Sequence, residues 1–248
     1  MTGLKGRVAI VTGGGTGIGK GIVRRLASAR CRLLVSAANS MVGAEKLRDE
    51  LRADGVEIEV VRADLRNPDA ARSIIASAVD TYGQLDILVN NAGFTLDEPF
   101  LDGTTARWQE IFNINLMSMI TASQDAARHM IEQGSGRIIN ISSVHGIVHM
   151  PGHAIYAATK GGINGFTRSL AVELAPHQVT CNVIAPGAIQ VDRYKAQNLE
   201  PRAVGAHIPM RRVGQPAEIA AAVAYLASDE ASYMTGSELV IDGGTTAE

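Results

Sequence analysis

Short apolar segments with the character of β-strands alternate with helix-like segments along the whole chain. The segments predicted to form strands are residues 7–11, 32–36, 56–61, 85–89, 137–141, 179–184 and 239–241. The segments predicted to form helices include residues 18–26, 41–53, 154–175 and 216–226, together with one long helix over 105–133. Strands and helices that alternate in this way form a parallel sheet with helices on both faces. The sequence therefore predicts an α/β, Rossmann-type doubly wound sheet of about seven strands.

The length of 248 residues fits one domain, and we find no linker or internal repeat that would divide residues 1–248. Residues 190–212 form the one irregular stretch, and they directly follow a predicted strand. Ligands of doubly wound sheets bind beyond the carboxyl ends of the strands. We therefore expect residues 190–212 to act as a substrate lid.

A glycine-rich turn, Thr12-Gly13-Gly14-Gly15-Thr16-Gly17-Ile18-Gly19, joins the first predicted strand to the first helix. Such a turn lets the backbone approach a pyrophosphate, and the helix N-terminus offers free N–H groups with partial positive charge. The strict G-x-G-x-x-G pattern is not met, because three residues separate Gly13 from Gly17. An ordinary glycine-rich loop stays the alternative. The residues expected to contact a dinucleotide here are Gly13, Gly15, Thr16, Gly17, Ile18 and Gly19.

The overall charge and hydropathy exclude several classes of partner. A formal net charge of −2 provides no basic surface for nucleic acid or an anionic membrane. No apolar run is long enough to cross a bilayer, and the first residues show no signal-peptide pattern. Cys31 and Cys181 lie in or beside predicted strands, where buried reduced thiols are expected. These features predict a cytoplasmic protein that binds neither nucleic acid nor membranes.

Polar and small residues follow four of the predicted strands. They are Asp64-Leu65, Asn90-Asn91-Ala92-Gly93, Ser142-Ser143 and Pro186-Gly187. Each could be an ordinary turn, because Asn, Ser and Gly are common in loops. Since the carboxyl ends of parallel strands meet at one edge of the sheet, we expect all four to border a common ligand site.

Tyr156 and Lys160 lie four residues apart on a predicted helix and therefore share one of its faces. An ammonium group near a phenol favours the ionised phenol, whose ordinary pKa is about 10. A phenol in such a setting can pass a proton to or from an alcohol oxygen. The alternative is an amphipathic helix on which Tyr and Lys are an incidental pair.

Taken together, these motifs resemble those of the short-chain dehydrogenase/reductase family, and in particular its 3-oxoacyl-acyl-carrier-protein reductase-like members. The motifs that carry the resemblance are Thr12–Gly19, Asn90–Gly93, Asn115, Ser143, Tyr156 with Lys160, and Pro186-Gly187. The resemblance covers essentially the whole chain, through Ile241-Asp242-Gly243-Gly244. It implies an NAD(P)-dependent enzyme that interconverts a small-molecule secondary alcohol and a ketone by hydride transfer.

The resemblance also implies residue roles. Tyr156 would be the acid/base, Lys160 would hold the nicotinamide ribose, and Ser143 would hydrogen-bond the reacting oxygen. Asn115 would order a water molecule that relays protons to Lys160. The implied cofactor contacts outside the glycine-rich turn are Ser36, Asn39, Asp64, Leu65, Asn91, Ala92, Gly93, Tyr156, Lys160, Pro186, Gly187 and Ile189.

The end of the second strand bears on the choice of coenzyme. NAD-specific folds place a carboxylate about 20 residues beyond the glycines, where it binds the ribose 2′-hydroxyl. This chain instead has Val35-Ser36-Ala37-Ala38-Asn39-Ser40. Ser36 and Asn39 could bind a 2′-phosphate, although the cation that NADP-using relatives often carry is missing. We therefore expect both coenzymes to be accepted, with NADP slightly favoured.

The chain also departs from the family pattern at three positions. Val191 stands where members often have Thr, so a neighbouring residue must replace that cofactor contact. Gly134 and His177 stand where reductases of carrier-protein substrates typically have Arg, which weakens docking of an acidic carrier protein. Reduction of a 3-oxoacyl thioester is therefore the alternative to the alcohol/ketone reaction. A dinucleotide-binding sensor or scaffold without catalysis is the alternative from another class.

Two further expectations concern the pocket rim and assembly. His145, His149 and His153 recur every four residues, but Gly146, Pro151 and Gly152 interrupt any helix that would align them as metal ligands. We expect no metal, and imidazoles that rim the substrate pocket. The resemblance implies a homotetramer built through the two long helices and the last strand.

Overall fold

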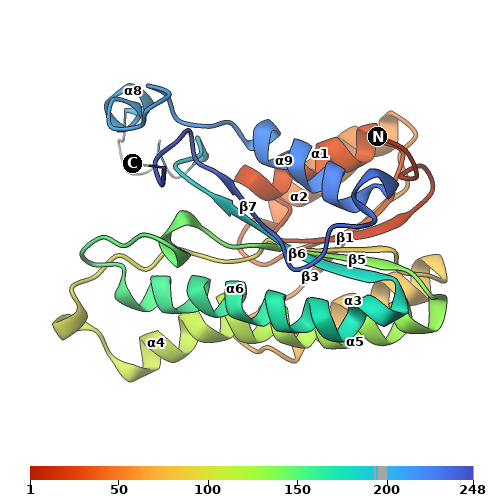
Figure 1. Ribbon diagram of the computed structural model, residues 1–248. Coiled ribbons are helices and arrows are strands. Elements are labelled where there is room, and N and C mark those ends of the chain that lie inside the picture. The colour runs from red at the N-terminus through yellow and green to blue at the C-terminus, as the bar shows by residue number, and fades with distance from the viewer. Residues whose placement is uncertain (193, 195–199, 248) are drawn as a thin grey trace.

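Within residues 1–192, 194 and 200–247, which the computed structural model describes, seven parallel strands form one sheet with the order β3-β2-β1-β4-β5-β6-β7 (Figure 1). The strands are β1 (Val8–Thr12), β2 (Arg32–Ala37), β3 (Ile58–Arg62), β4 (Ile87–Asn90), β5 (Gly136–Ile141), β6 (Val179–Pro186) and β7 (Glu238–Ile241). The helices are α1 (Gly17–Ser28), α2 (Met41–Ala53), α3 (Ala70–Tyr82), α4 (Thr105–Phe112), α5 (Ser118–Gln133), α6 (Ala154–Leu174), α8 (Pro201–Gly205) and α9 (Pro216–Ala227). This order confirms the predicted doubly wound, Rossmann-type fold.

Two hydrophobic layers enclose the sheet. Figure 1 shows α1, α2 and α9 on one face and α3, α5 and α6 on the other, and each group packs on its own apolar cluster. β1, β4, β5 and β6 are buried along their whole length, as expected for strands that are covered on both faces. The sheet is therefore held by burial of near-continuous apolar runs.

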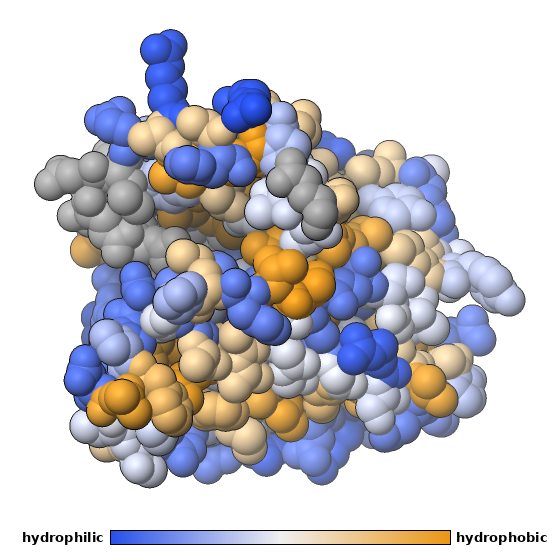
Figure 2. Space-filling view, turned by 60° about the vertical axis from the view of Figure 1, so that its left-hand side comes forward, coloured by the Kyte–Doolittle hydropathy of each residue, from blue (hydrophilic) through white to orange (hydrophobic). Residues whose placement is uncertain are grey.

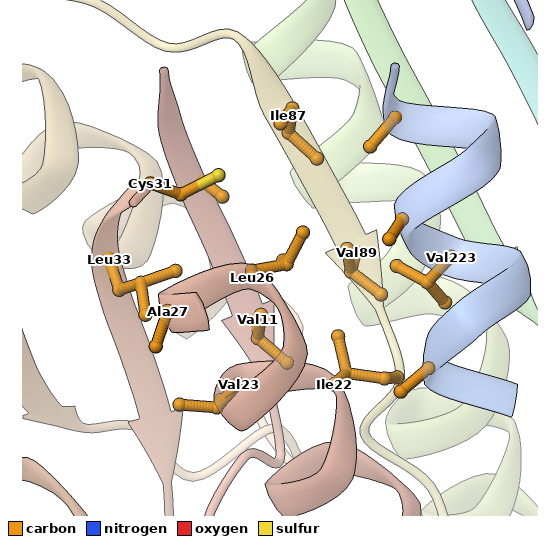
Figure 3. Close-up of a cluster of buried hydrophobic side chains, with 14 of the residues drawn as sticks. Val11, Ile22, Val23, Leu26, Ala27, Cys31, Leu33, Ile87, Val89 and Val223 are labelled. Atoms are coloured by element: carbon orange, nitrogen blue, oxygen red, sulfur yellow. The ribbon is translucent and has the colours of Figure 1, made fainter. Parts of the chain in front are cut away.

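The packing of α1 fixes the position of the glycine-rich turn. Ile22 and Leu26, whose helical spacing predicts a buried face, are both 0 % exposed. Figure 3 shows them beside Val11 of β1 and Val89 of β4. Burial of each such side chain contributes about 1.5–3 kcal/mol relative to exposure. The first turn of α1 is thereby held over the carboxyl end of β1.

The strand order changes direction between β1 and its two neighbours. β1 pairs with β2 on one side and with β4 on the other. After β3 the chain therefore crosses to the other side of β1, where it adds β4. A crevice outside the strand ends is expected at such a switch point. The loops that follow β1 and β4 meet there.

The expected long helix over residues 105–133 is wrong in one respect. The chain follows a helical path throughout, but residues Asn113–Met117 form a π turn between α4 and α5. Sequence spacing does not reveal such a turn, because one inserted residue leaves the apolar pattern on either side intact. The interruption contains Asn115, one of the predicted site residues.

Buried amides tie β4 and β5 to the helices that cover them. Asn90 Nδ2 donates to Asn140 Oδ1 at 2.8 Å and to Ser123 Oγ at 3.1 Å. Asn140 Nδ2 in turn donates to Thr167 Oγ1 at 2.9 Å. Because each amide has a partner, the polar groups remain stable inside an apolar layer. Across the described ranges, no helix has the length and apolar character needed to cross a bilayer.

Candidate active site

A cavity of about 840 Å³ opens at the carboxyl edge of the sheet. The strands run toward the left in Figure 1, and Figure 2 turns this side forward, where hydrophilic and hydrophobic residues are interspersed. The predicted site residues that line the cavity are Gly13, Thr16, Gly17, Ile18, Gly19, Ser36, Asn39, Asp64, Leu65, Asn91, Ala92, Gly93, Ser143, Tyr156, Lys160, Pro186, Gly187 and Ile189. Gly15 and Asn115 are not among the described residues of its wall.

The glycine-rich turn has the backbone shape that a pyrophosphate cradle needs. Gly13 and Gly17 have φ values of 67° and 51°, in the region that favours glycine. A Cβ atom on Gly19 would lie 2.2 Å from the Gly13 carbonyl oxygen, so no side chain fits between the turn and α1. The first turn of α1 contains no acidic residue, and its N-terminus faces the cavity with partial positive charge. These residues fit a dinucleotide phosphate.

Thr12 and Asn91 join this turn to the loop after β4. The backbone N–H groups of Asn91 and Ala92 both donate to Thr12 Oγ1 at 3.0 Å. Asn91 Nδ2 donates to the carbonyl oxygens of Thr12 and Gly13 at 2.9 and 3.2 Å. Asn91 therefore lies at the cavity wall with its amide used to shape the turn. Gly15 allows a different close contact, because a Cβ atom at this position would lie 2.5 Å from the Ser40 carbonyl oxygen.

The far end of the cavity is lined by the residues that follow β2 and β3. Ser36 and Asn39 lie there, as predicted, beside Asp64. Sequence reasoning missed Arg66, which also lines the cavity and donates to both carboxylate oxygens of Asp64. The side-chain hydrogen bond from Arg66 is the main reason that the pKa of Asp64 falls to about 2. Asp64 and Arg66 are only two residues apart in the sequence, and this spacing could have predicted their contact.

Lys160 and Tyr156 lie together at the other end. Lys160 is 5 % exposed, and its Nζ donates to the Ile141 carbonyl oxygen at 3.0 Å and lies 5.6 Å from the centre of the Tyr156 ring. A second bond holds the lysine backbone, because Ser142 Oγ donates to the Lys160 carbonyl oxygen at 3.1 Å. The predicted face of the helix that carries both residues is therefore turned into the cavity.

The two adjacent serines have different environments. Both serines line the cavity, but Ser142 Oγ donates to the Lys160 carbonyl oxygen of α6, whereas Ser143 Oγ accepts from the backbone N–H of His145 at 3.2 Å. An accepted bond leaves the hydroxyl hydrogen of Ser143 available for a substrate oxygen. The choice of Ser143 over Ser142 as the reacting serine stays a prediction, because both hydroxyls lie at the cavity wall.

Asn115 lies behind the wall in the π turn. Its Oδ1 accepts from the Phe94 N–H at 3.0 Å, and its Nδ2 donates to the Phe94 carbonyl oxygen at 3.0 Å and to Thr159 Oγ1 at 3.3 Å. A Cβ atom on Gly93 would lie 3.1 Å from Asn115 Oδ1 and 3.8 Å from Lys160 Nζ. The amide thus fixes the loop after β4 beside the lysine.

Two of the three predicted rim histidines reach the cavity. His145 and His153 line it, whereas His149 is exposed and is not part of the described wall. Among the residues with described positions, no group of three His, Cys, Asp or Glu side chains is arranged to hold a metal ion. Phe94 and Thr95 line the cavity near the same end, and no sequence signal marked them.

The segment after β6 forms one side of the cavity. Ile189 is 5 % exposed and forms a bridge with Gly214. A Cβ atom on Gly187 would lie 2.7 Å from the Asp242 Cβ, so this position allows close contact with the segment after β7. Val191 lies on the cavity wall and packs near Gly17. Part of the expected lid, residues 193 and 195–199, lies outside the described residues.

The similarity to known proteins extends along nearly the whole chain. A family model described as enoyl-(acyl carrier protein) reductase matches residues 13–246. A 3-oxoacyl-[acyl-carrier-protein] reductase from Synechocystis is 40 % identical over 245 residues, covering 98 % of both chains. The chain belongs to the short-chain dehydrogenase/reductase family.

Other members of the short-chain dehydrogenase/reductase family act on different carbonyl compounds. An acetoacetyl-CoA reductase from Allochromatium vinosum is 42 % identical and covers 96 % of this chain and 98 % of its own. The crystal structure of acetoin dehydrogenase from Enterobacter cloacae superimposes with a TM-score of 0.90 at 37 % identity, covering 97 % and 96 % of the two chains. The protein is therefore an oxidoreductase of CH–OH and keto groups in a small-molecule substrate, and it uses a nicotinamide dinucleotide.

Proposed function

We propose that this protein interconverts a secondary alcohol and a ketone with Tyr156 as the acid/base. The observation that carries the proposal is the buried Lys160 ammonium 5.6 Å from the Tyr156 ring, with Ser143 in the same cavity. The positive charge stabilises the ionised phenol that forms when Tyr156 gives its proton to a ketone oxygen. The Ser143 hydroxyl donates to the same oxygen and holds it in place.

The other predicted residues then support binding and proton supply. Lys160 holds the nicotinamide ribose hydroxyls, and Ile189 backs the nicotinamide, which carries the hydride when bound. Asn115 orders the water that returns protons to Lys160 by keeping the π turn and the loop of Phe94 in register. Residues 1–248 act as one dinucleotide-binding domain, and residues 190–212 serve as its substrate lid.

Substitution of Tyr156 by Phe tests the acid/base assignment. The change removes the hydroxyl and keeps the ring beside His145 and His153. We expect kcat to fall by at least about 10²-fold, the low end for general acid–base catalysis, with coenzyme affinity retained. Tyr225, on α9 outside the described cavity wall, offers a matched control for loss of a phenol hydroxyl. Near-wild-type turnover of the Tyr156→Phe protein would refute the assignment.

A second candidate is reduction of 3-oxoacyl thioesters, which the 3-oxoacyl and acetoacetyl-CoA reductases among the relatives favour. The missing arginines argue against a carrier-protein substrate. Gly134 ends α5 with φ 71°, a backbone conformation that arginine rarely adopts. Turnover of a panel of polyols, sugars, small ketones and 3-oxoacyl thioesters separates the two reactions. If the protein binds coenzyme but turns over none of these compounds, a sensor or scaffold would be favoured.

We propose that the protein accepts NAD and NADP, with NADP slightly favoured. The Asp64 carboxylate, on the wall with Ser36 and Asn39, is paired with Arg66, which offsets its repulsion of a 2′-phosphate. Neutral hydrogen-bond donors favour the phosphate only weakly. The test is kcat/KM for both coenzymes on one substrate. A preference for NAD above about 10²-fold, some 2.7 kcal/mol, would refute the proposal.

We propose a homotetramer with two-fold axes. Support comes from Val172 on α6, which is 75 % exposed, and from Val240 on β7, which is 41 % exposed at an edge of the sheet. Gly165 on α6 has open space at its Cβ position, so another chain could approach closely. Association would cover this apolar surface and the free strand edge. A monomer mass in light scattering at micromolar concentration would contradict the assembly.

A further inference from the structure

The imidazoles of His145 and His153 form a stacked pair against the proposed acid/base. Their ring centres are 4.8 Å apart with 22° between the planes. Both meet the Tyr156 ring edge-on, at centre-to-centre distances of 6.0 and 6.1 Å. All three side chains line the cavity, and His153 is 8 % exposed. A substrate held by Tyr156 would therefore share its cavity with both imidazoles.

The neighbours of His153 determine which ring nitrogen carries its hydrogen. Nδ1 lies 3.2 Å from the Pro151 carbonyl oxygen and 3.9 Å from Asp97 Oδ1. Both oxygens accept hydrogen bonds, so the neutral ring carries its hydrogen on Nδ1. Nε2 is then left as an acceptor. A ligand that complements this nitrogen must donate a hydrogen bond.

The position of His153 is also unusual for helix stability. It is the N-cap residue of α6, yet its side chain makes no capping hydrogen bond. Ser, Thr, Asp or Asn at an N-cap stabilises a helix by about 1 kcal/mol more than a residue that does not cap. Residues that break such a local rule are expected at functional sites. The backbone around His153 is nevertheless fixed, because the Glu98 N–H donates to the Gly152 carbonyl oxygen at 3.0 Å.

We propose that His153, supported by the His145 ring, binds a hydroxyl group on the carbon next to the reacting carbonyl. This inference rests on the proposed alcohol/ketone reaction at Tyr156 and names its substrate class, α-hydroxyketones and the corresponding vicinal diols. A reacting oxygen lies about 3 Å from the hydroxyl of the phenol that bonds it. The imidazole centre lies 6.1 Å from the centre of that ring, a separation that suits a donor on the carbon next to the reacting one.

Three matched ketones test the proposal with the full-length enzyme and coenzyme. They are 3-hydroxybutan-2-one, 3-methoxybutan-2-one, which keeps the oxygen but cannot donate, and butan-2-one, which lacks it. We expect kcat/KM for the hydroxyketone to exceed that for each of the other two by at least about tenfold, which corresponds to 1.4 kcal/mol. The preference should come mainly from KM, because the hydroxyl is held in both substrate and transition state. A methoxyketone that equals the hydroxyketone would overturn the proposal.

Two variants distinguish substrate binding from a structural role. His153→Asn introduces a favoured N-cap residue, so Tm should not fall. Because its Oδ1 then accepts from a backbone N–H of α6 and no longer from the substrate, the hydroxyketone preference should drop to within about threefold of unity. His153→Leu should lose the preference as well, because its side chain cannot accept a hydrogen bond. His149→Leu, in the same loop but outside the described cavity wall, should keep the wild-type preference. An unchanged preference in either His153 variant would overturn the proposal.

The outcome separates this inference from the proposed function. Turnover of 3-oxoacyl thioesters without preference for the hydroxyketone would leave the oxidoreductase reaction intact and refute the role of His153. Loss of all ketone turnover in Tyr156→Phe, together with a hydroxyketone preference in the wild-type protein, would support both the proposed reaction and the role of His153. Absence of turnover with every carbonyl compound would refute both.

Discussion

Gly19→Ala is the substitution for which helix propensity and tertiary packing predict opposite signs. Gly19 lies in the first turn of α1, where Ala is intrinsically favoured over Gly by about 1 kcal/mol. The new Cβ would lie 2.2 Å from the Gly13 carbonyl oxygen and 2.6 Å from Asn91 Nδ2. Neither atom can retreat easily, since the first is backbone and the second donates to Thr12 and Gly13.

The packing terms outweigh the propensity term. Overpacking of this kind costs about 1–3 kcal/mol, and a displaced Asn91 amide forfeits two hydrogen bonds of about 1 kcal/mol each. We therefore expect a net loss of about 2–4 kcal/mol in the free energy of unfolding. The turn that lines the cavity would shift as well, so coenzyme Kd should rise at least about tenfold.

Gly21→Ala supplies the control within the same helix. Its Cβ would lie 2.8 Å from the Pro216 Cβ, at the contact between α1 and α9 and away from the cavity wall. We expect this variant to lose stability without weakening coenzyme binding. Denaturant unfolding and fluorescence titration with coenzyme measure the two effects. A Gly19→Ala protein that is as stable as wild type, or that binds coenzyme with unchanged Kd, would show that the turn is not packed as described.

Three further changes have defined outcomes. Asn140→Leu removes bonds to β4 and α6 and leaves buried polar partners, so the unfolding free energy should fall by about 2–3 kcal/mol in denaturant titration. Ser142→Ala frees the Lys160 carbonyl oxygen and should lower kcat more than it changes coenzyme Kd in steady-state assays. Glu218 has its pKa lowered from 4.5 to about 2, mainly by the Arg212 hydrogen bond, so its contribution to stability is present above pH 4.5 and is lost toward pH 2. Glu218→Gln should therefore be less stable than wild type at pH 7, with the difference in Tm vanishing near pH 2.

The fold could be predicted from sequence because its determinants are local. Each buried strand is an apolar run, and each helix shows apolar spacing that matches the face turned to the sheet, as Ile22 and Leu26 illustrate. Parallel pairing then brings the strand ends to one edge without any knowledge of side-chain contacts. The positions of Ser143, Tyr156 and Lys160 in one cavity follow from that topology.

Other features depend on local backbone geometry and side-chain conformation that the apolar pattern does not show. The π turn at Asn113–Met117 inserts a residue without altering the apolar pattern, so the expected helix over 105–133 was wrong there. Arg66 lines the cavity, and the stacking of His145 on His153 depends on the path of the loop between β5 and α6. The expectation that imidazoles rim the pocket identified residue types and an approximate place, whereas the exposed position of His149 needed the structure.

The predictable residues of the site lie at strand ends, whereas the less predictable ones lie in a loop. Thr12 Oγ1 accepts two backbone N–H groups from the loop after β4, so the glycine-rich turn and the wall beside Lys160 are fixed to each other through one hydroxyl. That connection uses only strand ends, which the sheet places rigidly. The proposed substrate-binding residues His145 and His153 come instead from the loop between β5 and α6, where the Gly152 carbonyl oxygen accepts from the N–H of Glu98 in another loop. Changes at His153 can therefore alter substrate preference while leaving Lys160 in place, because the Lys160 ammonium is held by the Ile141 carbonyl oxygen at the end of β5.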